Sequence, residues 1–464
     1  MNKISPPAAN SPEARSVANH LQPYTNPALL RETGPQIMAA GRGIYVSDSE
    51  GREYIEGVSG LWCTSFGFGE KELIKAATEQ MEKLPYYHSF TGKTVNPAID
   101  LAEKLISIAP EGLDKAFFCN SGSEANDTAI KMVWYYHAAI GKPEKRKIIS
   151  RKRGYHGVTL AAASLTALPY VQDGFSLPLD FALHTGSPHY FQDAHDGETE
   201  AEFVARRMQE LEELIEAEGA ETIGAMIVEP IMGAGGVVVH PEGYFDALQP
   251  ILKKHDILLI ADEVICGFGR TGNMFGSHTF NIRPDILTCA KALSSAYLPI
   301  SAVLVCDKVV AGVEAQAERL GQFGHGYTYS AHPVPAAVAV RTLALMEERN
   351  MINHVRNMTP LFAERVAALG RFDCVGNTRS VGLIGAAEFV LEPGSRTKID
   401  PTVKFAAKVV KMAQDEGVIL RALPLDGIAF CPPLIITEDE INVMFDRIEA
   451  VMPEADRMVA EMRG

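Results

Sequence analysis

The sequence has no apolar run long enough to span a bilayer and no excess of basic residues. Its 464 residues include 43 lysines and arginines against 58 aspartates and glutamates, a formal net charge of −15 at pH 7. This charge argues against a surface that binds nucleic acid or anionic lipid. The N-terminal stretch also lacks the apolar segment of a signal peptide. We therefore expect neither a nucleic-acid nor a membrane partner.

Cysteine is scarce, and its placement argues against a disulfide framework. The seven residues are odd in number, contain no C-x-x-C pair and are scattered at positions 63, 119, 266, 289, 306, 374 and 431. Such usage is typical of reduced, buried thiols in a cytoplasmic protein. A chain of this length buries enough apolar surface to fold without a disulfide or a structural metal, and we expect no metal site.

Apolar segments of strand length alternate with helical patterns through the middle of the chain. Strands are predicted at 115–120, 223–230, 257–264, 285–290 and 300–306. Because helical patterns separate them, they predict an α/β fold with a mostly parallel sheet covered by helices on both faces. In such sheets the chemistry lies beyond the carboxyl ends of the strands.

The two ends of the chain have other patterns. Residues 1–20 are rich in Pro, Ala, Ser and Asn and predict a mobile arm, or one ordered by a partner. After Pro333, helices and short mixed strands predict a smaller α+β domain. We divide the chain into an N-terminal arm with part of the small domain (1–72), a large domain (73–335) and a C-terminal small domain (336–464).

Two charged residues follow apolar strands at the predicted functional edge. Asp262 comes directly after the run ILLIA, and Lys291 directly after the strand 285–290. A buried aspartate can hold a ring nitrogen protonated, and a buried lysine can form a Schiff base. Taken singly, each is more often an ordinary solvated residue.

Two motifs suit the binding of a flat, anionic ligand. In CNSGSEAN, Ser121, Gly122 and Ser123 open a helix, where free N–H groups suit a phosphate. Plain helix capping is the alternative. In RGYHGVTL, Tyr155 and His156 lie on a turn between glycines, where a ring can stack on a ligand, although loop packing is the commoner use.

Two further segments carry groups that bind anions. HGYTYSAHP contains Tyr327 and Thr328 in a turn rich in glycine and aromatic residues, and an ordinary surface turn is equally consistent with it. Arg421, in LRALP, lies at the end of a short predicted strand. An arginine there suits a carboxylate, bound bidentately, or a surface ion pair.

Taken in order, these motifs resemble the class III aminotransferases, which are pyridoxal 5′-phosphate (PLP) enzymes of fold type I, over roughly residues 25–440. The resemblance implies PLP as cofactor, bound by the large domain. It implies a ping-pong transamination in which Lys291 forms the Schiff base and moves the proton. It also implies that Asp262 pairs with the pyridinium nitrogen.

The same resemblance assigns the other cofactor contacts. Val264 matches the residue under one face of the ring, and Tyr155, with His156 beside it, the aromatic residue on the other. The phosphate-binding turn matches Ser121, Gly122 and Ser123. Tyr327 and Thr328 match a segment that reaches the phosphate from the neighbouring subunit, so a homodimer is expected, and the sequence leaves a tetramer open.

Departures from the family pattern resemble its amine:pyruvate branch. Where γ-aminobutyrate and ornithine aminotransferases have a second glutamate in E-P-x-x-G-E, this chain has Ala234, and Ile265 replaces their glutamine after D-E-V. Trp62 matches a bulky wall of the small substrate pocket in that branch. Without a glutamate at 234, no carboxylate competes there for the substrate-binding arginine.

In that branch Arg421 matches a mobile arginine that binds the carboxylate of pyruvate and swings away for an amine lacking one. Trp62, Phe90 and Tyr155 would form the apolar wall for the amine, with Phe90 supplied across the dimer interface. One departure concerns the loop after the catalytic lysine, where Ala292 and Ala296 replace the usual glycines. A positive φ at either would add strain of about 1 kcal/mol or more.

The sequence therefore predicts a PLP-dependent transaminase that moves an amino group from a primary amine or ω-amino acid to pyruvate, giving alanine. β-Alanine, taurine or polyamine:pyruvate aminotransferases are alternatives, and a mutase, racemase or decarboxylase on the same fold is less favoured. A nicotinamide-dependent dehydrogenase is disfavoured because no G-x-G-x-x-G follows an early strand. A non-catalytic protein would have no reason to combine Lys291, Asp262 and the phosphate turn.

Overall fold

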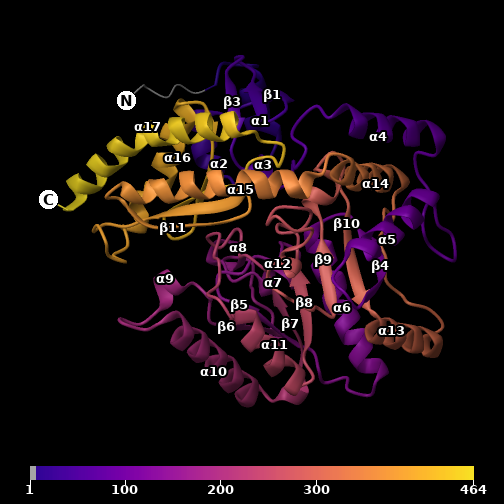
Figure 1. The fold of residues 1–464 in the computed structure, drawn as a ribbon. Helices are drawn as coiled ribbons and strands as arrows, with labels where there is room; N and C mark the ends of the chain where they lie inside the picture. Colours follow the sequence, from indigo (N-terminus) through magenta and orange to yellow (C-terminus); the bar gives the residue numbers. More distant parts are fainter. Residues whose placement is uncertain (1–6, 464) are drawn as a thin grey trace.

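The computed structural model describes residues 7–463 and has a large sheet below two smaller sheets and the C-terminal helices (Figure 1). The large sheet has the strand order β4-β10-β9-β8-β7-β5-β6. Its strands are β4 (Leu113–Cys119), β5 (Lys147–Arg151), β6 (Ala182–Thr185), β7 (Ile223–Val228), β8 (Leu258–Asp262), β9 (Ile286–Cys289) and β10 (Ser301–Cys306). All neighbours are parallel except around β10, which is antiparallel to both β4 and β9. The predicted mostly parallel sheet is confirmed.

Helices cover both faces of this sheet because its strands are apolar on both sides. In β8, Leu258 and Ile260 pack into one core with helix α6 (Gly122–Ala139). Leu259 and Ala261 pack into the other with α10 (Glu200–Glu218) and α11 (Tyr244–Lys254). This alternation leaves the carboxyl ends of β8 and β9 as the place where polar side chains can gather.

Two four-stranded sheets bring the chain ends together. One has the order β1-β2-β3-β13, with β1 (Met38–Arg42), β2 (Tyr45–Asp48), β3 (Glu53–Glu56) and β13 (Val418–Ile419). The other has the order β11-β12-β15-β14, with β11 (Val375–Val381), β12 (Ile384–Phe389), β15 (Gly427–Phe430) and β14 (Arg421–Leu423). Residues before position 72 and after 336 thus share a sheet, and the division into domains stays a prediction.

The remaining helices connect or cover these sheets. Those before the large sheet's last strand are α3 (Ser59–Trp62), α4 (Lys71–Lys83), α5 (Asn96–Ile108), α7 (Leu160–Leu165), α8 (Pro169–Gln172), α9 (Tyr190–Asp193) and α12 (Gly276–Thr279). Those after it are α13 (Asp307–Leu320), α14 (Pro333–Glu348), α15 (Met351–Ala368), α16 (Phe405–Asp415) and α17 (Glu438–Arg463). None of the helices within residues 7–463 has the length and apolar character that crossing a bilayer requires.

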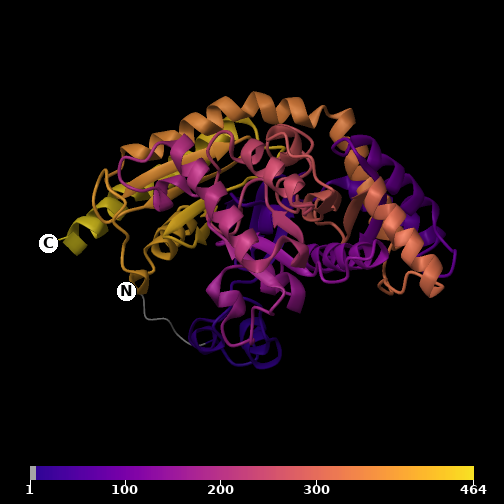
Figure 2. The same cartoon turned by 90° about the horizontal axis from the view of Figure 1, so that it is seen from below.

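The N-terminal segment differs from the mobile arm that its composition predicts. It forms the helices α1 (Pro12–Asn19) and α2 (Pro27–Thr33), each opened by a capping side chain and a proline in its first turn. Residues 1–6 of the predicted arm lie outside the described residues. Figure 2 shows the N-terminal segment beside the chain around residue 170, where the Tyr24 and Tyr170 rings meet edge to face at 6.1 Å.

The turn after β9 shows which of its two alanines, Ala292 or Ala296, has a positive φ. It begins with a 3-10 turn, Lys291–Ser294, and ends at Ala296, whose φ is +62°. Ala292 lies inside the 3-10 turn and has no positive φ. Only Ala296 therefore has the backbone strain expected of an alanine in a glycine position.

We expect Ala296→Gly to raise the free energy of unfolding by about 0.5–1 kcal/mol, because relief of the strain exceeds the added entropy of the unfolded chain. Ala292→Gly is the matched control and is expected to lower it by about 0.5–1 kcal/mol. Urea unfolding of the PLP-loaded variants measures both. Equal shifts in the two variants would contradict the assignment of strain to Ala296.

Candidate active site

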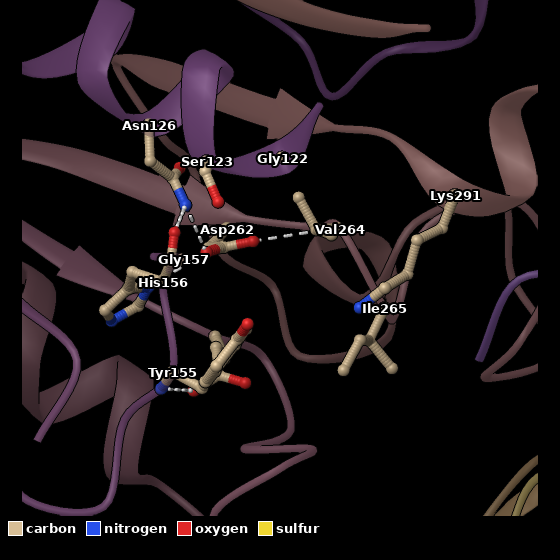
Figure 3. A pocket seen from close by; sticks show the side chains of 11 residues that line it. Gly122, Ser123, Asn126, Tyr155, His156, Gly157, Asp262, Val264, Ile265 and Lys291 are labelled. Atoms are coloured by element: carbon tan, nitrogen blue, oxygen red, sulfur yellow. Dashed lines mark hydrogen bonds and ion pairs between the residues drawn. The ribbon is translucent and has the colours of Figure 1, made fainter. Parts of the chain in front are cut away.

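A cavity opens at the carboxyl edge of the large sheet, and most of the predicted cofactor residues line it (Figure 3). They come from the start of α6, from the turn after β5 and from the ends of β8 and β9. The predicted residues that share this cavity are Gly122, Ser123, Tyr155, His156, Asp262, Val264 and Lys291. The fold thus brings together side chains separated by up to 169 positions, from Gly122 to Lys291.

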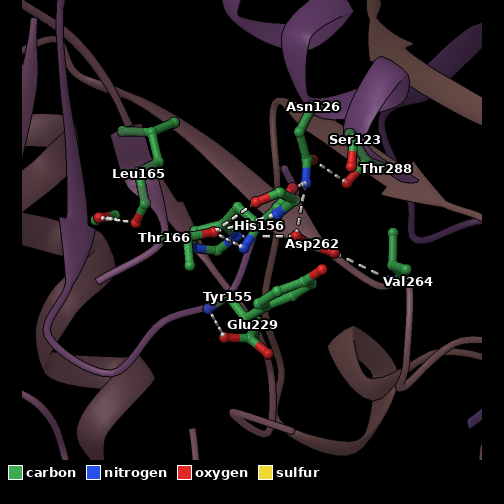
Figure 4. A network of polar contacts seen from close by, with 12 residues as sticks. Ser123, Asn126, Tyr155, His156, Leu165, Thr166, Glu229, Asp262, Val264 and Thr288 are labelled. Atoms are coloured by element: carbon green, nitrogen blue, oxygen red, sulfur yellow. Dashed lines mark hydrogen bonds and ion pairs between the residues drawn. The ribbon is translucent and has the colours of Figure 1, made fainter. Parts of the chain in front are cut away.

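The carboxylate of Asp262 is the most strongly hydrogen-bonded group of the cavity (Figure 4). The side chain is only 4% exposed. Its Oδ2 accepts hydrogen bonds from Asn126 Nδ2 and His156 Nδ1, both at 2.8 Å, and its Oδ1 accepts one from the Val264 amide at 3.1 Å. These donors compensate the loss of water around the buried carboxylate and fix its orientation.

Asn126 is itself held in one orientation by its neighbours. Its Nδ2 also donates to the His156 carbonyl at 2.6 Å, and its Oδ1 accepts from Thr288 Oγ1 at 2.8 Å. Thr288 lies opposite Asp262 in the β8–β9 pairing. Neither Asn126 nor Thr288 was identified as a site residue from the sequence. The available signal was that Asn126 follows Gly122 by one helical turn and so shares its face of α6.

Lys291 enters the cavity from a strained backbone position. It is the first residue of the 3-10 turn after β9 and has a φ of +49°. Burial lowers the pKa of its ammonium group, which favours the neutral, nucleophilic amine. Within residues 7–463, Nζ of Lys291 forms no hydrogen bond and no ion pair, so the amine is free to react.

The start of α6 offers a small anion site. Oγ of Ser121 caps the helix by accepting from the Glu124 amide at 3.2 Å, which leaves the first-turn amides of Gly122 and Ser123 without an intrahelical acceptor. A Cβ on Gly122 would lie 3.1 Å from the Val264 side chain, so only glycine lets the helix approach this closely. This arrangement suits a phosphate at the edge of a flat ring.

A buried glutamate, Glu229, positions Tyr155. The sequence indicated no role for Glu229 beyond beginning the segment compared with E-P-x-x-G-E. The Tyr155 amide donates to Glu229 Oε1, and the Gly233 amide to Glu229 Oε2, both at 3.0 Å. The Tyr155 hydroxyl lies 3.2 Å from that of Tyr24. Burial raises the pKa of Tyr155, with the charge of Arg421 opposing it, so the phenol stays neutral.

Of the predicted substrate residues, Tyr155 lines this cavity, and Trp62, Ala234 and Arg421 are outside its lining. Trp62 is 3% exposed, has a φ of +65° and packs in the same cluster as Ile265. Ala234 packs in a cluster against Tyr155. The charge of Arg421 acts on both Lys291 and Tyr155, yet its guanidinium forms no hydrogen bond or ion pair within residues 7–463.

Besides Ser121, Trp62, Ala234 and Arg421, three predicted residues do not line the cavity in this chain. Phe90 is 42% exposed and lies beside Gly326. Tyr327 turns its hydroxyl to its own α6, where it donates to the Glu124 carbonyl at 3.2 Å, and Thr328 is exposed. That these three residues act from a neighbouring subunit stays a prediction.

No group of three or more His, Cys, Asp or Glu side chains within residues 7–463 is arranged to hold a metal ion. All seven cysteines are free thiols. The donors of the cavity instead fit a planar, phosphorylated heterocycle. A fixed carboxylate, a free lysine amine and two free amides next to a close-packed glycine lie within one cavity.

Comparison with known proteins identifies the family. The family model "Aminotransferase class-III" matches residues 31–452. A curated relative from Oryza sativa subsp. japonica, γ-aminobutyrate transaminase 1 (mitochondrial), is 44% identical over 100% of this chain and 90% of its own length. A Solanum lycopersicum enzyme of the same description is 45% identical over 96% of this chain and 86% of its own.

Solved structures agree with this result. The omega transaminase of Pseudomonas jessenii in complex with PMP is 47% identical, with a TM-score of 0.95, over 97% of this chain and 99% of that one. A transaminase with L-alanine is 50% identical, with a TM-score of 0.89, over 91% and 100%. A thermostable omega transaminase engineered for enantiopure bulky amines, with one tryptophan, one phenylalanine and one arginine substituted, is 47% identical, with a TM-score of 0.95, over 97% and 100%.

The fold, the cavity and these comparisons lead to one conclusion: the chain belongs to the class III aminotransferases and is a PLP-dependent transaminase of fold type I.

Proposed function

We propose that this transaminase moves an amino group from a primary amine or ω-amino acid to pyruvate, releasing alanine. The observation that carries the proposal is the guanidinium of Arg421, which has no hydrogen-bond or ion-pair partner within residues 7–463 and whose charge acts on Lys291 and Tyr155 in the cavity. An arginine without a counterion binds a carboxylate bidentately. A keto acid as acceptor and an amine as donor suit a cation that can turn toward the ligand or away from it.

The chain's own residues support this chemistry around PLP. Bound PLP supplies an electron sink for the carbanion at the substrate carbon. Asp262, fixed by Asn126 and His156, has an Oδ1 lone pair available for a ring N–H. The amides of Gly122 and Ser123 would hold the phosphate. The amine of Lys291 would hold the cofactor covalently and, once the substrate amine has displaced it, would move the proton at the substrate carbon.

The substrate side of the cavity favours an acceptor with one carboxylate. Ala234 has a methyl group where γ-aminobutyrate and ornithine aminotransferases have a glutamate that competes for the arginine, and Ile265 adds an apolar side chain to the cavity lining. In the engineered omega transaminase described above, the substituted tryptophan, phenylalanine and arginine are spaced at the same sequence intervals as Trp62, Phe90 and Arg421. This correspondence supports a role for these three residues in substrate size and charge.

We also propose a homodimer, with Phe90, Tyr327 and Thr328 contributed to the neighbouring active site, and a cytoplasmic location. Exposed aromatic side chains near Phe90 support the homodimer: Tyr86 is 38% exposed and Tyr329 60%, and their rings meet edge to face at 5.8 Å. Exposed apolar surface of this kind favours association. The seven free thiols support the location.

A second candidate donor is γ-aminobutyrate. The full-length relatives that carry this substrate in their names support it. With this donor, Arg421 would bind the carboxylate of both donor and acceptor in turn.

The test is the visible absorption of the PLP-loaded enzyme during each half-reaction. We expect 1-phenylethylamine to abolish the absorption band and pyruvate to restore it, with alanine released. Lys291→Ala, which lacks the amine, should hold PLP but show neither change. If γ-aminobutyrate abolishes the band and 1-phenylethylamine does not, the donor is the amino acid rather than the amine. A band that pyruvate fails to restore would contradict the acceptor.

Arg421→Ala is expected to lower kcat/KM for pyruvate by about 10- to 100-fold, because a charge-assisted bidentate contact is lost. A neutral aldehyde acceptor should be affected by about twofold at most, since it has no carboxylate. The control is Arg371→Ala, which removes an ion pair with Glu449 and local contacts with Ala368 and Phe372, all outside the cavity lining. Steady-state kinetics with both acceptors decides. Equal losses for the two acceptors would show that Arg421 does not bind the carboxylate.

Trp62→Ala is expected to raise kcat/KM for bulkier amines by about tenfold, because the pocket gains the volume of the indole. It should also lower the free energy of unfolding by about 3 kcal/mol. Trp134, the other tryptophan, packs against Phe181 away from the cavity, so Trp134→Ala is the matched control. If Trp62→Ala and Trp134→Ala have the same substrate profile, Trp62 lies outside the pocket.

A further inference from the structure

A buried charged cluster connects the Arg421-bearing sheet to the large sheet. Its centre is Glu388 on β12, which is 0% exposed. Oε2 of Glu388 accepts from His189 Nε2 at 2.9 Å and from Arg379 Nη1 at 2.8 Å, while Oε1 accepts from Gln192. Burial raises the pKa of Glu388, but these donors outweigh it and lower that pKa to about 2. The carboxylate is therefore charged, and both of its oxygens accept hydrogen bonds.

One branch of the cluster runs through Arg379 to the loop after β7. Arg379 Nε donates to the Val237 carbonyl at 2.9 Å, and Nη2 donates to the Gly236 carbonyl. The next residue back, Gly235, lies directly against the Arg153 carbonyl, because a Cβ there would come within 2.0 Å of that oxygen. Fixing the carbonyls of the loop thus fixes one side of Arg153.

The second branch runs through α9. His189 directly precedes this short helix and Gln192 lies within it, so Glu388 holds the helix from one side through both side chains. Asp193, its last residue, accepts two parallel hydrogen bonds from Arg153, at 2.9 and 3.0 Å. Both branches from Glu388 therefore end at Arg153.

Arg153 needs to be held, since its φ is +70°. A non-glycine residue in this region costs about 1–3 kcal/mol and persists only where the surroundings enforce it. The strained residue begins the turn that leads to Tyr155 and His156, both in the cofactor cavity. Together with Glu229, which accepts from the Tyr155 amide, this turn sets where Tyr155 lies in the cavity.

We propose that Glu388 is a positioning residue, which through Arg379 and α9 holds the Arg153 turn so that Tyr155 lies against the PLP ring. The inference rests on the role assigned to Tyr155 in the proposed site, and it does not depend on which amine or keto acid reacts. The sheet that contains β12 would then have two roles. β12 pairs with β15 and β15 with β14, so the same sheet carries Arg421 and fixes the cofactor-facing turn.

The test measures the visible circular dichroism of enzyme-bound PLP and its release rate in Glu388→Gln. We expect a changed band amplitude and a release about three- to tenfold faster, the loss expected for a weakened aromatic stacking contact. Asp193→Asn should cause the same change to a smaller extent. Its side chain is 23% exposed, so this variant folds even if the buried substitution at 388 does not. Tyr155→Leu gives the reference signal for a lost stack.

Arg365→Met is the matched control. Arg365 binds Asn442 and Asp446 on α17, and its loss lowers stability in the same part of the molecule without touching α9 or Arg153. This control should leave the PLP signals unchanged. If Glu388→Gln and Asp193→Asn also match wild type in both signals, the cluster is only structural and the proposal is wrong. An unchanged band in Tyr155→Leu would likewise overturn it, whereas failure of the pyruvate or amine assignment leaves these signals unaffected.

Discussion

The structure depends on burying one carboxylate, that of Asp262, at the end of a central strand. A group 4% exposed is tolerated only if other elements bring donors to it. Asn126 from α6, His156 from the turn after β5 and the Val264 amide meet that need. The same three residues also line the cavity. The requirement of one charge thus fixes the relative positions of three separate segments.

Much of this arrangement could be predicted from the sequence because the signals are local. An apolar run followed by Asp262, and another followed by Lys291, place both residues at the carboxyl edge of a parallel sheet. The Ser121–Ser123 turn was found from helix-start chemistry alone. Family resemblance then supplied the roles that no pattern of residues could.

What could not be predicted depends on contacts between distant segments. The role of Thr288 follows from its register opposite Asp262, which no local pattern encodes. Strand β6, which was not among the predicted strands, forms where β5 offers it a parallel edge. The Glu388 cluster joins residues up to 199 positions apart, so each member resembles an ordinary polar residue in the sequence.

The left-handed backbone of Trp62 has a consequence for how this enzyme can change. A φ of +65° disfavours every residue with a Cβ and suits glycine. Replacing the indole with glycine would leave a void, but it would also release backbone strain, which offsets part of the cost. The residue proposed to limit substrate size therefore lies at a position where substitution costs comparatively little stability. Selection for larger substrates can begin there with less loss of stability than at most buried tryptophans.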